Sequence, residues 1–173
     1  PTTGALIRKF ELTANADSKG ITVDANGFWV LDEDEKTVTR YDLNGVFQSS
    51  FRVRPRGGHL EGITNDGSTL WIVDRDAGVF RYDFSGNLIQ SSSFQLDSDN
   101  SHAEGITTDG TSLWVVDRDK DRVFRYSAID ADVVVLDSFS VKPATHPEDI
   151  TTDGTSIWIV DKDSDRVFRF DIN

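Results

Sequence analysis

The chain has 173 residues, with 30 acidic and 18 basic side chains that give a formal net charge of −12. This charge argues against nucleic acid and anionic membranes as partners, because both repel an acidic surface. The chain has no cysteine, which excludes disulfides and thiolate chemistry, and its apolar runs are too short for a membrane-spanning helix.

The opening residues show no basic segment followed by an apolar one, so no signal peptide is expected. Because the sequence contains no methionine, we expect that Pro1 arises by processing, excision or trimming. An extracytoplasmic or secreted location is the expectation. The first predicted element is the strand "ALIRKFEL" at 5–12, whose pattern matches "NLIQSSSFQL" at 87–96.

A repeat organises the rest of the chain. Its four tryptophans are spaced by 42, 43 and 44 residues, and each follows an aspartate by five positions; they are Trp29, Trp71, Trp114 and Trp158. A period of about 40–50 residues with several short strands per unit is typical of a β-propeller blade. No window shows helical periodicity, so the sequence predicts an all-β protein.

The repeat predicts four four-stranded blades in one domain, 1–173. In chain order they cover 20–54, 61–97, 104–141 and 148–172, the last completed by 5–12. Blade three shows the strands most clearly: "EGITTDG" (104–110), "TSLWVVD" (111–117), "RVFRYS" (122–127) and "VVVLDSFSV" (133–141). The second is rich in β-branched and aromatic residues, and the third alternates in side-chain type.

The last predicted blade lacks a fourth strand, and the strand at 5–12 is spare. Pairing the two within one chain would close a four-bladed ring and remove two exposed edges. Two chains exchanging these strands head to tail would instead form a homodimer with an eight-bladed ring. A third alternative is that the chain is part of a longer propeller.

The run "GITTDGTSLWVVDRDKDRVFRYS" (105–127) resembles the NHL class of β-propeller repeat. The resemblance covers nearly the whole chain and is specific for the fold. It implies that the loops entering the inner strands share one face with the turns between strands two and three, a face that often binds ligands. It does not decide function, because propellers serve as enzymes, lectins, peptide binders and scaffolds.

All three histidines occupy the same place in the repeat, at the entry to an inner strand. The equivalent positions of the four blades hold Asp17, His59, His102 and His146, and the positions two residues later hold Lys19, Glu61, Glu104 and Glu148. Three imidazoles and a carboxylate around one axis form a plausible ligand set for Zn²⁺ or a similar divalent ion. The later positions would support the ligands or act as bases. The alternative is that repeat duplication copied the histidines without a metal.

The turns between strands two and three are rich in aspartate, which suggests Ca²⁺. The candidate ligands are Asp117, Asp119, Asp121, Asp161, Asp163 and Asp165. An EF-hand loop needs glycine at position six and glutamate at position twelve, where these segments have Arg122 or Arg166 and Ala128 or Ile172. The EF-hand interpretation therefore fails, and the favoured one is that aspartate caps a tight turn and pairs with the following arginine.

Aromatic residues recur at equivalent strand positions in every blade. They include the four tryptophans together with Tyr41, Phe80, Tyr82, Phe124, Tyr126, Phe168 and Phe170. Such rings can stack on carbohydrate, but recurrence in every blade favours a core between neighbouring sheets.

Function is predicted only as a class. The favoured hypothesis is a non-catalytic propeller that binds a protein or small molecule through its acidic, histidine-bearing face. The alternative is a metal-dependent enzyme of lyase or lactone hydrolase type, with the ion in the central channel and Glu104 or Glu148 as base. A purely structural repeat array is a third possibility.

Overall fold

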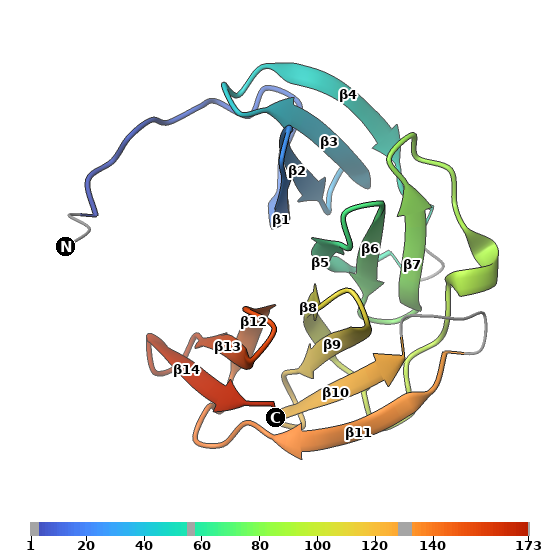
Figure 1. Ribbon diagram of the computed structural model, residues 1–173, viewed down its shortest axis with the longest axis vertical. Helices are drawn as coiled ribbons and strands as arrows, with labels where there is room; N and C mark the ends of the chain where they lie inside the picture. The colour runs from blue at the N-terminus through green and yellow to red at the C-terminus, as the bar shows by residue number, and fades with distance from the viewer. Residues whose placement is uncertain (1–3, 55–57, 128–132, 173) are drawn as a thin grey trace.

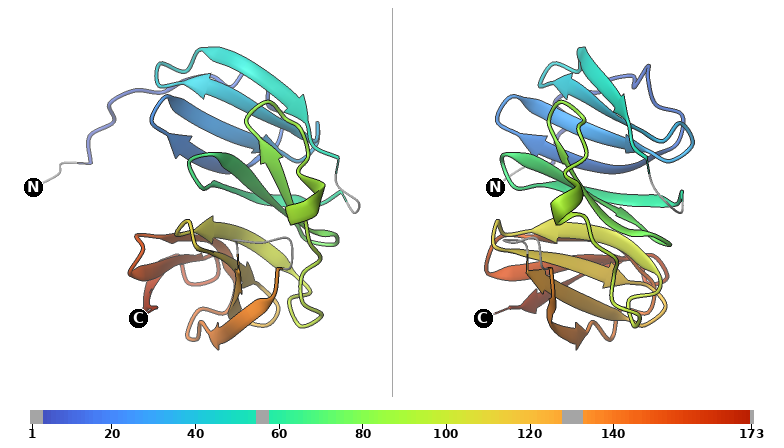
Figure 2. Two further views of the ribbon diagram at one scale, coloured as in Figure 1. Left: turned by 45° about the vertical axis from the view of Figure 1, so that its right-hand side comes forward. Right: turned by 90° about the vertical axis from the view of Figure 1, so that its right-hand side faces the viewer.

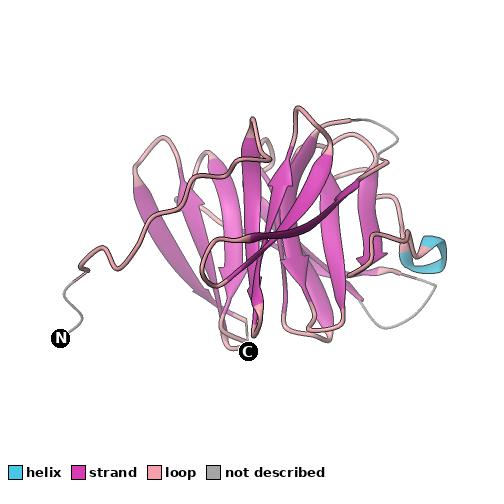
Figure 3. Ribbon diagram, turned by 90° about the horizontal axis from the view of Figure 1, so that it is seen from above, coloured by secondary structure: helices cyan, strands magenta, loops and turns pink. Residues whose placement is uncertain are grey.

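The computed structural model describes residues 4–54, 58–127 and 133–172. These residues form four antiparallel sheets that follow one another in chain order, like blades along an open arc (Figure 1). Strands dominate, and one short 3-10 turn, η1 (Gln90–Ser92), is the only helical segment in the described ranges (Figure 3). No helix in this part of the chain is long and apolar enough to cross a membrane.

Each sheet runs from an innermost strand near the centre of the arc to an outer strand at its rim (Figure 1). Blade one contains β1 (Ser18–Asp24), β2 (Gly27–Asp32), β3 (Thr37–Asp42) and β4 (Phe47–Arg52). Blade two contains β5 (Leu60–Asn65), β6 (Thr69–Asp74) and β7 (Gly78–Asp83). Blade three contains β8 (Ala103–Thr108), β9 (Ser112–Asp117), β10 (Arg122–Ser127) and β11 (Val135–Ser140). Blade four contains β12 (Pro147–Thr152), β13 (Ser156–Asp161) and β14 (Arg166–Asp171).

The outer position of blade two differs from the prediction. The segment 87–96 is not a continuous strand there, and it touches β7 through two isolated bridges, Val79 with Phe94 and Tyr82 with Leu88. Between these bridges the chain forms η1. The serine-rich sequence "QSSS" explains the interruption, because serine hydroxyls bond to nearby backbone and compete with strand pairing; Ser93 Oγ donates to the carbonyl of Ile89 at 3.2 Å.

Residues 5–12 do not complete blade four in this structure. They form no strand and lie along blade one, where the ring of Phe10 stacks on Phe28 with centroids 6.0 Å apart. β14 lies across the opening of the arc from them (Figures 1 and 2). The predicted pairing is absent within the chain because four blades turn through only part of a circle. Closure between two chains stays a prediction.

An aspartate holds the tight turn between the innermost and second strands of a blade. In blade three, Asp109 Oδ1 accepts the backbone N–H of Thr111 at 2.8 Å and of Ser112 at 2.7 Å. In blade two, the matching Asp66 also accepts the indole N–H of Trp71 at 3.0 Å. The five-residue spacing therefore places the aspartate in the turn, from where its carboxylate can bond the tryptophan ring.

The hydrophobic core lies between the blades. Three buried clusters fill the three junctions, and each contains one tryptophan; Trp29, Trp71 and Trp114 are at most 3% exposed. The Arg81 guanidinium lies over the Trp71 ring, 4.6 Å from the ring centroid. The prediction that the aromatic residues form the core between blades is confirmed for these three tryptophans.

Candidate functional site

A β-bulge interrupts the inner strand of every blade at the same place. The register shifts between Ser18 and Gly20 in β1, and equivalent shifts occur in β5, β8 and β12. The extra residue at each shift is Lys19, Glu61, Glu104 or Glu148. Because a bulge re-aims the side chain of its extra residue, the four charged side chains are presented together at the centre of the arc.

Each bulge side chain has a partner of opposite charge just after the second strand of its own blade. The pairs are Glu61 with Arg75 at 3.2 Å, Glu104 with Arg118 at 2.7 Å, Glu148 with Lys162 at 3.3 Å and Lys19 with Glu33 at 3.0 Å. Blade one has the two signs exchanged but keeps the pair. The pairing itself is thus a constant feature of the repeat.

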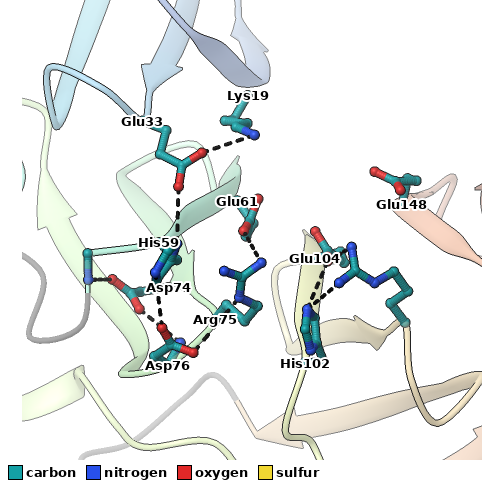
Figure 4. A network of polar contacts seen from close by, with 12 residues as sticks. Lys19, Glu33, His59, Glu61, Asp74, Arg75, Asp76, His102, Glu104 and Glu148 are labelled. Carbon is teal, nitrogen blue, oxygen red and sulfur yellow. Dashed lines mark hydrogen bonds and ion pairs between the residues drawn. The ribbon is translucent and has the colours of Figure 1, made fainter.

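These side chains line a cavity of about 200 Å³ at the inner edge of the blades. Its lining is charged throughout: Lys19, Glu61, Arg75, Glu104, Arg118, Glu148 and Lys162. Figure 4 shows the inner pairs of the first three blades side by side around this space. Cations therefore alternate with carboxylates around this cavity, and binding through the acidic, histidine-bearing face stays a prediction.

Glu104 is the most perturbed carboxyl of the site. Its side chain is 6% exposed, and burial, followed by the charge of Glu61, raises its pKa to about 7 even though Arg118 opposes the shift. Burial and the charge of Glu33 also raise the pKa of Glu61. Near neutral pH Glu104 therefore holds or releases a proton readily.

The raised pKa of Glu104 leads to a prediction for stability. A carboxyl whose folded pKa exceeds its unfolded value binds extra protons in the folded state, so the free energy of unfolding falls as pH rises between these values. They are 4.5 and about 7 here. Glu104→Gln imitates the protonated form, so its free energy of unfolding should exceed that of the parent by about 1–3 kcal/mol at pH 8 and match it near pH 4. Urea denaturation at both pH values measures this.

The exposed Glu35→Gln is the matched control, because it also removes one negative charge. An identical difference between Glu104→Gln and the parent at both pH values would contradict the raised pKa.

The histidines lie beside the charged pairs, each between carboxylates. His59 contacts Glu33 at 3.4 Å and Asp76 at 3.5 Å (Figure 4). In the same way His102 contacts Glu104 and Asp119 at 3.6 and 3.1 Å, and His146 contacts Glu148 and Asp163 at 3.1 and 3.6 Å. Asp17, in the corresponding position of blade one, lies 3.9 Å from Lys19.

The predicted ligand set of one aspartate and three histidines is not brought together as a single group in the described residues. One group in this part of the chain does have its possible ligand atoms within 4.8 Å of one another, and it consists of Glu33, His59 and Glu61. It combines one predicted ligand and one predicted supporting residue with Glu33, which the sequence did not single out. Metal binding at either set stays a prediction.

The aspartates of the predicted calcium loops have separate roles. The first of each turn is fully buried, and its carboxylate accepts backbone N–H groups: Asp117 accepts from His102 and Lys120, both at 2.8 Å. Asp161 likewise accepts from His146 at 2.6 Å and Ser164 at 2.9 Å. These oxygens hold the loop that enters the inner strand.

The other aspartates of these turns are at least partly accessible. Asp119 and Asp163 pair with histidines, Asp121 lies 3.9 Å from Lys142, and Asp165 is exposed. The predicted role in capping the turn is confirmed for the first aspartate, and calcium binding stays untested.

Sequence reasoning missed the residues that complete the charged pairs, namely Glu33, Arg75, Arg118 and Lys162. A signal was present, because each directly follows the aspartate that ends the second strand. Blade one has Lys19 and Glu33 where blade two has Glu61 and Arg75, so both charges are reversed together. This joint reversal would have indicated that the two positions form a pair.

The sequence matches no protein-family model and no curated protein. Its structure is similar to solved structures of low sequence identity. A catalytically inactive virginiamycin B lyase from Staphylococcus aureus, solved with quinupristin, matches with a TM-score of 0.69 and 22% identity, over 99% of this chain and 58% of the lyase chain. A nidogen/laminin complex matches with a TM-score of 0.69 and 16% identity, over 92% and 61%. Glutaminyl cyclase from Myxococcus xanthus matches with a TM-score of 0.70 and 12% identity, over 88% and 71%.

These structures are β-propellers, and so is this chain. The sequence predicted this fold, and the chain spans little more than half the length of the lyase. The similar structures include both enzymes and binding proteins, and a shared fold does not choose between these classes.

Proposed function

We propose that this chain is a non-catalytic binding propeller whose ligand occupies the charged cavity at the inner edge of the blades. The observation that carries the proposal is the cavity lining, in which every described side chain is ionisable. Two of its carboxylate oxygens, Glu104 Oε1 and Glu148 Oε1, are buried and accept no hydrogen bond of regular geometry, although both form ion pairs.

The lining also sets the chemical class of the ligand. Carboxylates and cations alternate around about 200 Å³, so a ligand with one sign of charge would meet repulsion as well as attraction. A small zwitterion can place its ammonium group near the glutamates and its carboxylate near Arg75 and Arg118. Amino acids and short peptides are therefore the expected ligands.

A panel of charged amino acids and dipeptides tests this proposal by thermal shift and calorimetry. A ligand at a hundred times its Kd should stabilise the fold by about 2.7 kcal/mol. Arg118→Gln should abolish the shift, because it removes the cation that faces the ligand carboxylate. Arg52→Gln, on the outer strand β4, is the control for charge. No response to any member of the panel would contradict the proposed ligand class.

The second candidate function is a metal-dependent enzyme of lyase or lactone hydrolase type, with an ion in the channel. One observation favours it: Glu33, His59 and Glu61 form a possible ligand group, and Glu104, with its pKa of about 7, lies in the next blade as a base. A general base works best when its pKa is near the working pH. The lyase among the similar structures supports this candidate only through its fold.

Added Zn²⁺ distinguishes the two candidates. If the group binds the ion, Zn²⁺ should raise the melting temperature of the parent and of His146→Ala. It should not change the melting temperature of His59→Ala, because His59 belongs to the ligand group and His146 does not. The response should weaken in acid, because a protonated imidazole cannot bind the ion. Equal responses of the two variants would show that Glu33, His59 and Glu61 do not bind the ion.

A further inference from the structure

The two end faces of the arc expose apolar side chains that are buried at every internal junction. Ile21 on β1 is 67% exposed, whereas the equivalent Ile63 and Ile106 are 5% and 3% exposed. On blade four, Val160 and Val167 form a cross-strand pair and are 42% and 63% exposed. The equivalent valine pairs of blades two and three are fully buried.

The two exposed faces are of complementary kinds. Each internal junction joins the tryptophan and valine side of one blade to the isoleucine side of the next; Trp71 and Val79 pack with Ile106, for example. Blade four therefore offers the first kind of face and blade one the second. They cannot meet within the chain, because they lie at opposite ends of the arc (Figure 1).

We propose that a second copy of this chain fills both faces, head to tail, so that two chains form an eight-bladed ring with two-fold symmetry. Each copy would contribute its blade-four face to one junction and its blade-one face to the other. Such an interface is of the head-to-tail kind, which closes when the rotation between copies brings the ends together.

The charges at the proposed junction support a second copy as the partner. At the first internal junction, Glu33 of blade one contacts His59 of blade two at 3.4 Å. The same two positions in the new junction hold Lys162 of one copy and Asp17 of the other. These side chains carry opposite charges, and complementary charges favour the correct partner and register.

The N-terminal segment provides a further element for this partner. Leu6 and Ile7 are 78% and 98% exposed, and the start of the segment projects away from blade one at the open side of the arc (Figure 2). β14 is the last strand of its sheet, and an edge strand readily accepts another strand. In the closed dimer, residues 5–12 of one copy would become the outer strand of blade four in the other.

Sedimentation of the full chain over a concentration series tests the proposal. The parent should approach twice its mass of 19.3 kDa and not exceed it, because a closed ring leaves no free face. Val167→Asp and Ile21→Asp each spoil one face, so each variant alone should be monomeric. Leu43→Asp, at an exposed position in the turn after β3, should dimerise like the parent.

Mixing the two variants gives the sharpest result. A mixture of Val167→Asp and Ile21→Asp retains one intact blade-four face and one intact blade-one face, so it should regain dimers although neither variant forms them alone. A contact between two identical faces would instead leave one variant dimeric by itself and the mixture without any gain. That outcome, a monomeric parent, or open-ended oligomers would overturn the proposal. Circular dichroism checks that the variants fold.

Asp149 offers a test of how closely the new junction copies the internal ones. Asp149 occupies the position that Gly62 holds in blade two. A Cβ atom added to Gly62 would lie 3.0 Å from the backbone nitrogen of Ile106 in the next blade. Asp149→Gly should therefore tighten the dimer at least several-fold. Weakened association in this variant would show that the junction is built differently and would overturn the proposed packing.

Discussion

Trp71→Ala is expected to lower the free energy of unfolding by about 3–5 kcal/mol, the usual loss for a large aromatic side chain removed from a core. The ring is 1% exposed and belongs to the cluster between blades two and three. Its loss also frees Asp66 from the indole N–H and removes the ring beneath Arg81. Urea denaturation followed by circular dichroism measures the difference.

Trp158→Ala is the matched control, because the same residue type holds the equivalent position on the open face of blade four. At protein concentrations where the chain is monomeric, this variant should lose less stability than Trp71→Ala. A loss below about 1 kcal/mol for Trp71→Ala would be typical of a surface position and would mean that the blades do not pack as described.

Asp117→Ala is expected to cost about 3–4 kcal/mol. The carboxylate is fully buried and accepts the backbone N–H groups of His102 and Lys120. A hydrogen bond to a charged group contributes about 1.5–3 kcal/mol, and buried donors left unpaired add their own cost of desolvation. The loop that enters β8 should also loosen, which hydrogen exchange at His102 would detect.

Asp119→Ala is the natural comparison, because it lies two residues further along the same turn and its side chain is 57% exposed. Its loss should cost less than about 1 kcal/mol, as for exposed ion pairs. Both residues belong to the predicted calcium loop, so the parent should also be melted with millimolar Ca²⁺. A calcium response that Asp119→Ala removes would favour a metal over a solvated turn.

The blades could be predicted well from the sequence because the same turn and strand residues recur at the same positions in each repeat. The Trp71 spacing and the turn at Asp66 recur with the same chemistry, so the alternation of strand and turn could be predicted without tertiary information. The outer strands were harder to predict, since the segment 87–96 looks like a strand but its serines bond locally. The position of residues 5–12 depends on how far four blades curve, which no local pattern contains.

The candidate site was predicted in part. The sequence identified the inner charged positions, but it gave the central place to the histidines, because it could not show that a bulge at Glu104 turns that side chain inward. It also missed Arg118, whose effect depends on lying 2.7 Å from that carboxylate. Both errors concern the direction of a side chain, and direction is set by tertiary geometry.

The bulge has a consequence for how such a protein can diversify. At each bulge the backbone path is fixed by strand pairing, while the side chain faces the charged cavity and a partner of opposite charge instead of the apolar core. Its identity can therefore change when the partner residue changes with it, as the reversed pair of Lys19 and Glu33 shows. The inner surface can therefore diversify by paired exchanges of charge, one blade at a time, while the strands and turns of the scaffold stay the same.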